Sequence, residues 1–590
     1  MTSPSSSAAM FDQQLIRNTF WHLIPVSILY YLATWIQPVI DAMIAGKMLG
    51  SAALEALVVA AAFSFFTSMI VSFVMVGGRT RASFHIGRGD YDGLCGVYSF
   101  CMLFFLAVGT VLALAGWLIP VPLTRLLGAQ VAVLGMASSY VGILCVGSFF
   151  SFAEMALIFF AMLMGKQNHC FIATALVVIT DVALDIFFIT AFHWGTTGLA
   201  LATVIGYLAG TVYLLLALGR TPLRFRPSLI NRQELPEIIR QGLPFTIGSA
   251  GIFVRSVIYN HFVGGLAGSA AMVLGLSLQN SINGWLSAPT AGCAEIVSMM
   301  TGIYLGEGDT EAIKKILRVG LQGGWITASM LAGLAFLFAP LLVSAYGVTA
   351  AAATCVVAVR AFCLKIVVGV PSWVMAMYYE TIGREKLAHA INIFEPFALP
   401  VLLVGPMVAL FGNDGFWYVY VVADIITIAV VYGIIAAGQK RFPLKGEDFF
   451  LLDGRFTDEF VAIRSLTIHN DVADVVRISQ ALRTFCQEHG VDRGRAYKIG
   501  LSAEEMAGNI VAHAFDKGGD HAIDLCVQIR KSGDIALRIR DNGSPFNPIA
   551  YASNAPADEF AGIGIRMVKA MARKMEYHHI GGLNNLLIIV

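Results

Sequence analysis

Residues 86–93 read IGRGDYDG, and residues 305–312 read LGEGDTEA. The two stretches lie 219 positions apart (305 − 86), and the same offset separates Pro25 from Pro244. Proline and glycine punctuate secondary structure, so an offset shared between such residues indicates a duplication. The sequence therefore predicts two structural repeats in this part of the chain.

The composition indicates that most of the chain lies in a membrane. Of its 590 residues, 57% are hydrophobic and 13% are charged, whereas a soluble domain carries about 25% charged residues. Long apolar runs extend to about Ile435, and charges become dense from Gln439 onward. A part surrounded by membrane lipid therefore precedes a soluble part. The net charge is +1 and there is no basic stripe with interleaved aromatic residues, so no nucleic-acid partner is expected.

The apolar runs predict transmembrane helices, because about 20 apolar residues in a helix cross the hydrocarbon core of a bilayer. Twelve candidate spans start near residues 20, 53, 94, 131, 171, 196, 242, 270, 319, 350, 387 and 415. Together with the repeat, they predict two six-helix bundles that face each other across a central cavity, which is a transporter architecture. The predicted boundaries are an N-terminal segment 1–19, a first bundle 20–220, an inter-repeat loop 221–241, a second bundle 242–438, a linker 439–454 and a soluble domain 455–590.

Basic residues in the loops predict which helix ends face the cytoplasm. One alternate set of loops carries most of them, and the opposite set carries little beyond Lys47 and Arg125. By the positive-inside rule the first set is cytoplasmic, so both termini and the soluble domain face the compartment that contains ATP. The first set consists of Arg79, Arg81, Arg88, Lys166, Arg220, Arg224, Arg226, Arg232, Arg240, Lys314, Lys315, Arg318, Arg384 and Lys386.

Four motifs carry a resemblance to a known family: DAMIAGKMLGSAALEAL (41–57), GRGDY (87–91), DVALDIFFI (181–189) and GTTGLALATVIG (195–206). On these motifs the chain resembles the multidrug and toxic compound extrusion (MATE) family over residues 15–438. The resemblance implies a polytopic α-helical protein of a bacterial inner membrane. It also implies antiport, in which H⁺ or Na⁺ is the coupling ion and small organic compounds, often cationic or polycyclic, are exported.

Three aspartates lie in otherwise apolar predicted spans: Asp41 in the first, and Asp181 and Asp185 in the fifth. Asp181 and Asp185 are four residues apart, so they share one face of a helix. A carboxylate at bilayer depth costs at least ~2.5 kcal/mol, so it is expected to be paired, protonated or bound to a cation. Like-charged neighbours favour proton uptake, which allows such a cluster to exchange a proton for sodium or substrate. The alternative for Asp41 is a position in water at the outer end of its helix.

The resemblance implies a role for these aspartates. In MATE proteins similar to this chain, the matching residues line a cation site in the N-terminal bundle, which would comprise Asp41, Asp181, Asp185 and, at a further polar position, Thr203. The family usually has asparagine where Asp181 stands, which implies a higher local charge here. Asn260 replaces aspartate at the equivalent position of the second repeat, so we expect the N-terminal bundle to couple the ion.

The second bundle also carries charged residues within predicted spans. Opposite charges there could pair and be purely structural, or they could take part in transport, and the sequence leaves both interpretations open. These residues are Arg255, Glu295, Arg360, Lys365, Glu380, Glu395 and Asp424.

The soluble domain combines strand patterns with helix patterns. Apolar residues alternate in the predicted strands and recur with helical spacing in the predicted helices. We therefore predict an α/β sandwich, in which helices cover one face of a mostly antiparallel sheet. The predicted strands are 460–468, 522–530, 534–543 and 584–590, and the predicted helices are 471–490, 495–515 and 562–575.

Three groups of residues in this domain are suited to bind a nucleotide. The GIG of residues 562–564 lies before a helix, where free N–H groups and the helix dipole favour phosphate. Asp541 leaves a strand with Gly543 in the following turn, and an aspartate can accept a hydrogen bond from the amine of adenine. Glu505 and Asn509 share one helix face. An amide can ligate Mg²⁺ that bridges phosphates, and a carboxylate can polarise an attacking hydroxyl or water.

These groups carry a second resemblance. EEMAGNIVAHAF (504–515), DNGSPFNP (541–548) and GIGIRMVKAM (562–571) are similar to the N-box, adenine loop and second glycine box of the GHKL ATP-binding fold. The resemblance covers residues 455–590 and is strongest with the bacterial anti-sigma-factor serine kinases. It implies an ATP site with a short lid between Pro548 and Phe560. The implied site residues are Glu505 as general base, Asn509 as Mg²⁺ ligand, Asp541 at adenine, and Gly543, Gly562 and Gly564 as residues that shape the pocket.

Three functions are open at this point. The first is a MATE-like, cation-coupled antiporter whose soluble domain is a regulatory serine/threonine kinase, which acts on an anti-anti-sigma-like partner or sequesters a sigma-like factor. The second is a membrane receptor, in which the bundle senses a ligand and the ATP-binding domain signals to a protein partner. The third is an ATP-binding module that gates the transporter without phosphate transfer. The chain has no G-x-x-x-x-G-K-[ST] motif, which argues against a P-loop pump.

Overall fold

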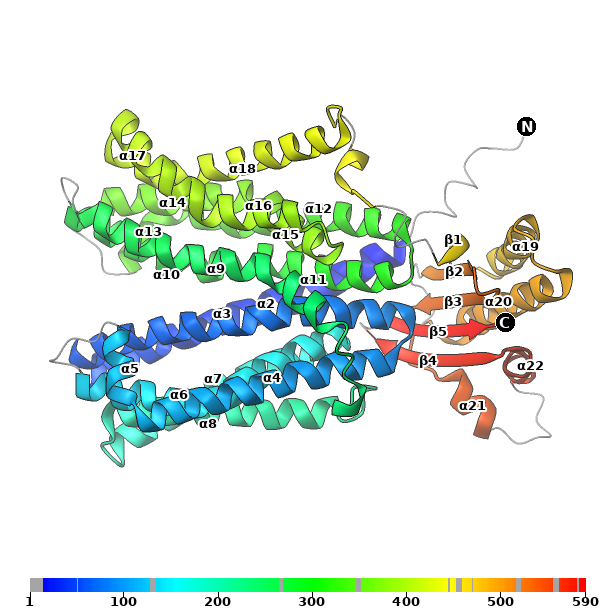
Figure 1. Ribbon diagram of the computed structural model, residues 1–590, viewed down its shortest axis with the longest axis horizontal. Helices are drawn as coiled ribbons and strands as arrows, with labels where there is room; N and C mark the ends of the chain where they lie inside the picture. The colour runs from blue at the N-terminus through cyan, green and yellow to red at the C-terminus, as the bar shows by residue number, and fades with distance from the viewer. Residues whose placement is uncertain are drawn as a thin grey trace.

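Two elongated helical bundles lie side by side, and a smaller α/β domain lies at one end of them (Figure 1). The structure is a computed structural model, and it describes residues 14–590 except 50, 128–133, 265–268, 346–351, 444–445, 453–458, 470, 516–521, 555–561 and 581–582. The side chains of Lys47 and Asn260, and residues 555–560 of the predicted lid, therefore lie outside the described part.

The first repeat folds into a bundle of long helices. Asp90 caps the start of one of them, because its side chain accepts a hydrogen bond from the backbone N–H of Gly93 at 2.9 Å. The elements are α2 (Gln14–Ile44), the π-helical turn η1 (Ala45–Leu49), α3 (Ser51–Arg88), α4 (Tyr91–Leu118), the short α5 (Pro120–Leu126), α6 (Leu134–Leu163), α7 (Gln167–Thr190) and α8 (Gly195–Leu218).

The second repeat follows the same order but divides three predicted spans into consecutive helices. Pro289 and Pro371 lie in the first turns of α11 and α15, where the missing N–H of proline is tolerated, so a new helix begins there. The elements are α9 (Leu235–Gly264), α10 (Ser269–Leu286), α11 (Ala288–Gly306), α12 (Thr310–Leu337), α13 (Ala339–Ala345), α14 (Ala352–Val368), α15 (Val370–Thr381), α16 (Glu385–Ile393), the π-helical turn η3 (Phe394–Ala398), α17 (Leu399–Phe411) and α18 (Gly415–Gln439). Three 3₁₀ turns complete this part of the chain: η2 (Pro227–Leu229), η4 (Gly412–Asp414) and η5 (Gly446–Phe449).

The helices agree with the predicted spans. Each of the twelve predicted starting points lies within one of these helices or at most three residues before it. By length and composition, six described helices are able to cross a membrane, or seven if α14 and α15, which meet at 42°, count as one span. The prediction of a polytopic helical membrane part is confirmed.

The duplicated glycines lie where the two bundles touch. A Cβ atom on Gly87 would lie 2.9 Å from the Cα atom of Gly306, and a Cβ atom on Gly306 would lie 2.9 Å from the Cα atom of Gly87. Helices approach this closely only where both residues lack a side chain. Nearby, Arg79 of α3 forms a buried ion pair with Glu295 of α11. The repeat motif therefore forms the seam between the bundles at the end that carries the α/β domain (Figure 1).

The α/β domain is a five-stranded antiparallel sheet with helices on one face. The strand order is β1-β2-β3-β5-β4. Its core lies between the helices and alternate residues of the strands, such as Val527, Leu537 and Ile588. The elements are β1 (Phe460–His469), α19 (Val472–Glu488), α20 (Arg493–His513), β2 (Ala522–Arg530), β3 (Ile535–Asp541), α21 (Pro548–Asn554), α22 (Ile563–Met571), β4 (Lys574–Ile580) and β5 (Leu583–Ile589).

One predicted element of this domain is wrong at its end. The helix predicted for 562–575 ends at Met571, and Lys574 begins β4, a strand that the sequence did not predict. The stretch KMEYHHI of β4 lacks a clear apolar alternation, but it pairs with the strongly apolar β5 along its whole length. Pairing with a neighbour thus outweighs the local pattern.

Candidate functional site

The three intramembrane aspartates lie together. Asp41 at the end of α2 and Asp181 and Asp185 of α7 each offer a carboxylate oxygen within 4.8 Å of the others. Asp181 and Asp185 are buried, and Asp41 is partly exposed. Gln37, one turn before Asp41, donates a hydrogen bond from Nε2 to Asp181 Oδ2 at 2.9 Å. The packing of α2 on α7 therefore builds one acidic cluster from two distant segments.

Several oxygens of this cluster have no hydrogen-bond partner among the described residues. They are Asp41 Oδ1, Asp181 Oδ1 and both oxygens of Asp185. A buried carboxylate without a partner is costly, so it takes up a proton or holds a cation. Oxygen ligands suit hard cations, and a proton satisfies the same groups. The arrangement is therefore able to bind Na⁺ or H⁺.

The fourth residue of the predicted cation site lies on the neighbouring helix. Thr203 of α8 is buried, and its Oγ1 donates to the carbonyl of Leu199 at 3.1 Å. It also interacts with Asp181. The sequence did not single out Gln37. A polar residue one turn from Asp41 on the same face is the signal by which Gln37 could have been found.

Several charged residues of the second bundle form pairs in the structure. Lys365 Nζ lies 2.9 Å from Glu395 Oε1, and Asn392 donates to Glu380 at 2.7 Å. Glu295 pairs across the seam with Arg79 of the first bundle, a partner that the sequence did not suggest. These contacts favour the structural interpretation for Lys365, Glu395 and Glu295.

The predicted nucleotide residues of the α/β domain come from three elements, α20, β3 and α22, and from the turn after β3. Glu505 and Asn509 lie on α20, and Asp541 ends β3. Gly562 precedes α22 as its N-cap with φ of 78°, a left-handed conformation that favours glycine. A Cβ atom on Gly564 would collide with the carboxylate of Glu505, so Glu505 lies directly against the start of α22.

The turn after Asp541 is fixed to the end of α20. Ser544 N–H donates to the carbonyl of Ala514 at 3.0 Å, and a Cβ atom on Gly543 would lie 2.6 Å from the same oxygen. Asp541 is 3% exposed and accepts hydrogen bonds from Asn584 Nδ2 at 2.7 Å and from Gly543 N–H at 2.8 Å. Burial raises the pKa of the Asp541 carboxyl above its ordinary value, and these hydrogen bonds oppose the rise.

One further residue of this site was missed by the sequence. Asn584 of β5 holds Asp541 and also lies 3.2 Å from the carbonyl oxygens of Gly543 and Ser544. A polar residue at the start of the apolar strand NNLLIIV was the available signal. The site thus brings together a buried carboxylate, a helix start with two glycines, and a carboxylate and an amide on one helix face.

Comparison with known families accounts for both halves. The family described as MatE matches residues 25–187, and the family described as histidine kinase-like ATPase domain matches residues 468–590. The chain joins a MatE domain to a histidine kinase-like ATPase domain. Both resemblances drawn from the sequence are confirmed at this level.

Individual relatives divide in the same way. The chain is 23% identical over 364 residues to the probable multidrug resistance protein YoeA of Bacillus subtilis. The matched region covers 58% of this chain and 77% of the relative. The multidrug export protein MepA of Staphylococcus saprophyticus is 26% identical over 208 residues, 35% of this chain and 46% of the relative. The serine/threonine-protein kinase BtrW of Bordetella bronchiseptica is 30% identical over 95 residues, 15% of this chain and 66% of the relative.

Solved structures share the fold of the MatE part. The outward-facing conformation of a multidrug resistance MATE family transporter superposes with a TM-score of 0.67 at 18% identity, over 75% of this chain and all of that chain. A MATE structure in the bent conformation gives a TM-score of 0.63 at 18% identity, over 72% and 98% of the two chains. The MatE part therefore has the MATE transporter fold.

Proposed function

We propose that this protein is a cation-coupled antiporter for small organic compounds, with an ATP-binding regulatory domain on its cytoplasmic side. The observation that supports the transport half most strongly is the cluster of Asp41, Asp181 and Asp185, in which Asp41 Oδ1, Asp181 Oδ1 and both oxygens of Asp185 lack partners among the described residues. A cation from outside, H⁺ or Na⁺, would neutralise the cluster, and its release to the cytoplasm would accompany export of the substrate. The MATE fold and the names of two relatives, a multidrug resistance protein and a multidrug export protein, support export of the substrate.

The ATPase-like domain would bind ATP with Mg²⁺ in the site described above. Asp541 would accept from the adenine amine, Asn509 would ligate Mg²⁺, and Gly543, Gly562 and Gly564 would keep the pocket open. Glu505 would accept the proton of a serine or threonine hydroxyl, whose oxygen forms a bond to the γ-phosphorus while the bond to the β-phosphate oxygen breaks and ADP leaves. The likeness to BtrW supports a kinase of this class. An anti-anti-sigma-like or sigma-like protein is the partner that we propose.

We place the protein in the inner membrane of a bacterium with both termini in the cytoplasm. The basic residues of alternate loops support this orientation.

A membrane receptor is the second candidate, and one observation favours it: the ATPase-like domain contacts the ends of both bundles, so movement of the bundles would reach it directly. Transfer of phosphate from radiolabelled ATP to a candidate partner distinguishes a kinase from a module that only gates transport.

Truncation separates the transporter from the receptor. The chain should be cut after Leu452 rather than before η5, because Tyr378 donates to the carbonyl of Phe450 at 2.7 Å and Tyr379 to that of Phe449 at 3.0 Å. These contacts make the segment before Leu452 part of the membrane domain. We expect the truncated chain in proteoliposomes to export organic cations when an ion gradient is imposed. The rate should be no lower than that of the full chain. Substrate fluorescence inside the vesicles is the measurement.

The full chain and a gradient-free sample are the controls for this experiment. Efflux by the full chain but none by a truncated chain that elutes as a single folded species would contradict an independent transport unit. Absence of efflux from both chains, together with ligand-dependent ATP binding by the full chain, would favour the receptor.

A further inference from the structure

The sheet of the ATPase-like domain has a second face that its own helices leave uncovered. Residues on this face alternate with the core residues of the same strands, and many of them are polar. In an antiparallel sheet, a polar face of this kind is usually solvated. Here it is buried, since the following side chains are all less than 9% exposed: Thr467, Gln528, Arg538 and Arg540, together with the apolar Cys526, Leu587 and Ile589.

The two copies of the repeat motif cover this face. Gly89 and Gly308 correspond in the repeat, and both have φ of 72°, so each loop turns sharply into the next helix. The space beside Gly89 holds Leu587 of β5, and the space beside Gly308 holds Phe460 of β1. Both loops therefore touch the sheet, one from each bundle.

One loop is held by a buried ionic contact. Glu307 is fully buried and pairs with Arg540, and Arg538 Nη1 lies 3.3 Å from its Oε1. Gln528 Nε2 donates to the backbone carbonyl of Glu307 at 2.8 Å. The guanidinium of Arg540 also lies 4.6 Å from the ring centroid of Tyr304 in α11. Since both partners are removed from water, loss of either leaves a buried charge unpaired.

The other loop is held by opposite charges and by aromatic contact. Arg88, which corresponds to Glu307 in the repeat, pairs with Glu459 at 2.9 Å, next to the start of β1. Tyr91 packs on His578 of β4 with ring centroids 3.8 Å apart. The repeat thus presents arginine from one bundle and glutamate from the other.

We propose that the sheet is a clasp that holds the ends of the two bundles together on the side of the ATPase-like domain. The loops at 86–93 and 305–312 lie on either side of the seam formed by Gly87 and Gly306. A five-stranded sheet is stiff, so it cannot stay bound to both loops while they separate. Opening of the bundles at this end requires release of the sheet from at least one loop. The clasp goes beyond the proposed function, because it needs neither ATP nor substrate.

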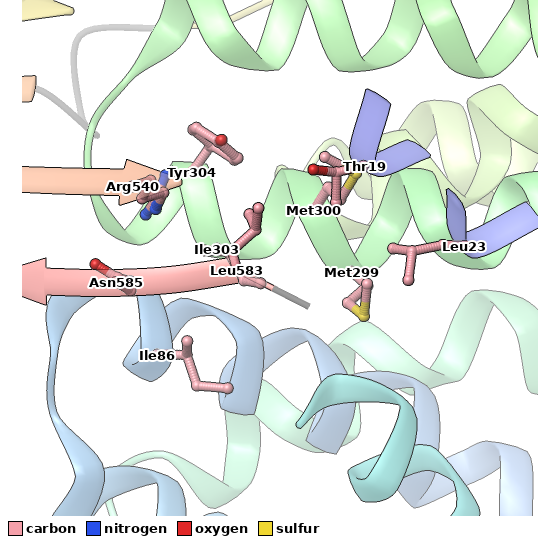
Figure 2. A pocket seen from close by; sticks show the side chains of 10 residues that line it. All are labelled: Thr19, Leu23, Ile86, Met299, Met300, Ile303, Tyr304, Arg540, Leu583 and Asn585. Carbon is pink, nitrogen blue, oxygen red and sulfur yellow. The ribbon is translucent and has the colours of Figure 1, made fainter. Parts of the chain in front are cut away.

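The junction is closed but incompletely filled. Figure 2 shows a cavity between the bundle ends and the sheet, lined by Thr19 and Leu23 of α2, by Ile303 of α11 next to Leu583 of β5, and by Arg540 of β3. Unfilled space forfeits dispersion contacts along its lining. The ionic contacts of Glu307 lie beside this unfilled space, so their removal should weaken the junction.

Distance measurement between spin labels tests the clasp in the full chain in lipid nanodiscs. Labels at Asn168→Cys in the first bundle and Lys386→Cys in the second occupy exposed positions, and the nine native cysteines are buried. We expect one short distance in this parent. Glu307→Lys should add a longer distance, and the ratio of long to short should rise roughly tenfold or more, because the variant places a third positive charge beside two arginines.

The matched control is Glu311→Lys, four residues further on. Its side chain is 72% exposed, and among the described residues it pairs with Lys314 of the same helix. This variant should keep the distance distribution of the parent. A mock-labelled parent without the two introduced cysteines reports background labelling.

A charge exchange keeps the test decisive if Glu307→Lys does not fold. Arg538→Glu with Arg540→Glu should give the long distance, and addition of Glu307→Arg should restore the short one. An unchanged distribution in folded Glu307→Lys, an equal change in Glu311→Lys, or a triple variant as broad as the double variant would overturn the clasp.

Discussion

Replacement of Asp41 by asparagine should strongly slow efflux driven by a proton or sodium gradient. Asp41 is one of three carboxylates within 4.8 Å, and the amide neither ionises nor releases a proton. With two carboxylates left, the cluster can no longer exchange the same charge as the bundle opens. We expect the initial rate in proteoliposomes to fall by about tenfold to a hundredfold, which corresponds to about 1.4 to 2.7 kcal/mol of lost coupling.

Asp92→Asn is the matched control for this substitution. Asp92 is an exposed aspartate in the first turn of α4, whereas the cluster lies on α2 and α7. This end of α4 faces the ATPase-like domain. It should transport as the parent does. Efflux by Asp41→Asn at the parent's rate, under either gradient, would show that the cluster does not couple the ion.

Replacement of Asp541 by asparagine should weaken ATP binding and leave the domain folded. Both hydrogen bonds to this side chain, from Asn584 and from Gly543, end on Oδ1, so an asparagine oxygen at that position can accept both. The second oxygen becomes an NH₂ group, which cannot accept from the adenine amine. Loss of one buried acceptor weakens Mg·ATP binding by about tenfold to a hundredfold.

Asp534→Asn is the control on the same strand ladder. Asp534 precedes β3 at its other end and pairs with Arg573 at 2.8 Å on the surface. Binding of a fluorescent ATP analogue to the full chain in detergent, with and without Mg²⁺, is the measurement. Tight binding by Asp541→Asn, or equal weakening in Asp534→Asn, would contradict the assignment of Asp541 to adenine.

The duplicated bundle was predictable because its signals can be read directly from the sequence. Spans of apolar residues and the shared offset of the repeat motifs need no knowledge of packing. The aspartates of the cluster were found for the same reason, since a charge inside an apolar span is conspicuous. Gln37 was not found, because a neutral polar residue gains meaning only when α7 is known to bring Asp181 beside it.

The burial of the second face of the sheet, which packs on the ends of the bundles, could not be predicted from the strand pattern. The alternation in IALRIR places Arg538 and Arg540 on the face opposite the core, and such a face is ordinarily exposed to water. Nothing in the period-two pattern says that Glu307, over 200 residues earlier, lies against it. The strand β4 was missed for a related reason, since its partner β5 supplies the apolar residues.

Efflux without nucleotide tests the central claim most directly. The full chain would be reconstituted in vesicles that contain no ATP, and export of a fluorescent organic cation would be followed after a proton or sodium gradient is imposed. The account predicts export that follows the gradient, stops when an ionophore dissipates it, and is at least about tenfold slower in Asp41→Asn. Export that occurs only when ATP is supplied, whatever the gradient, would contradict it.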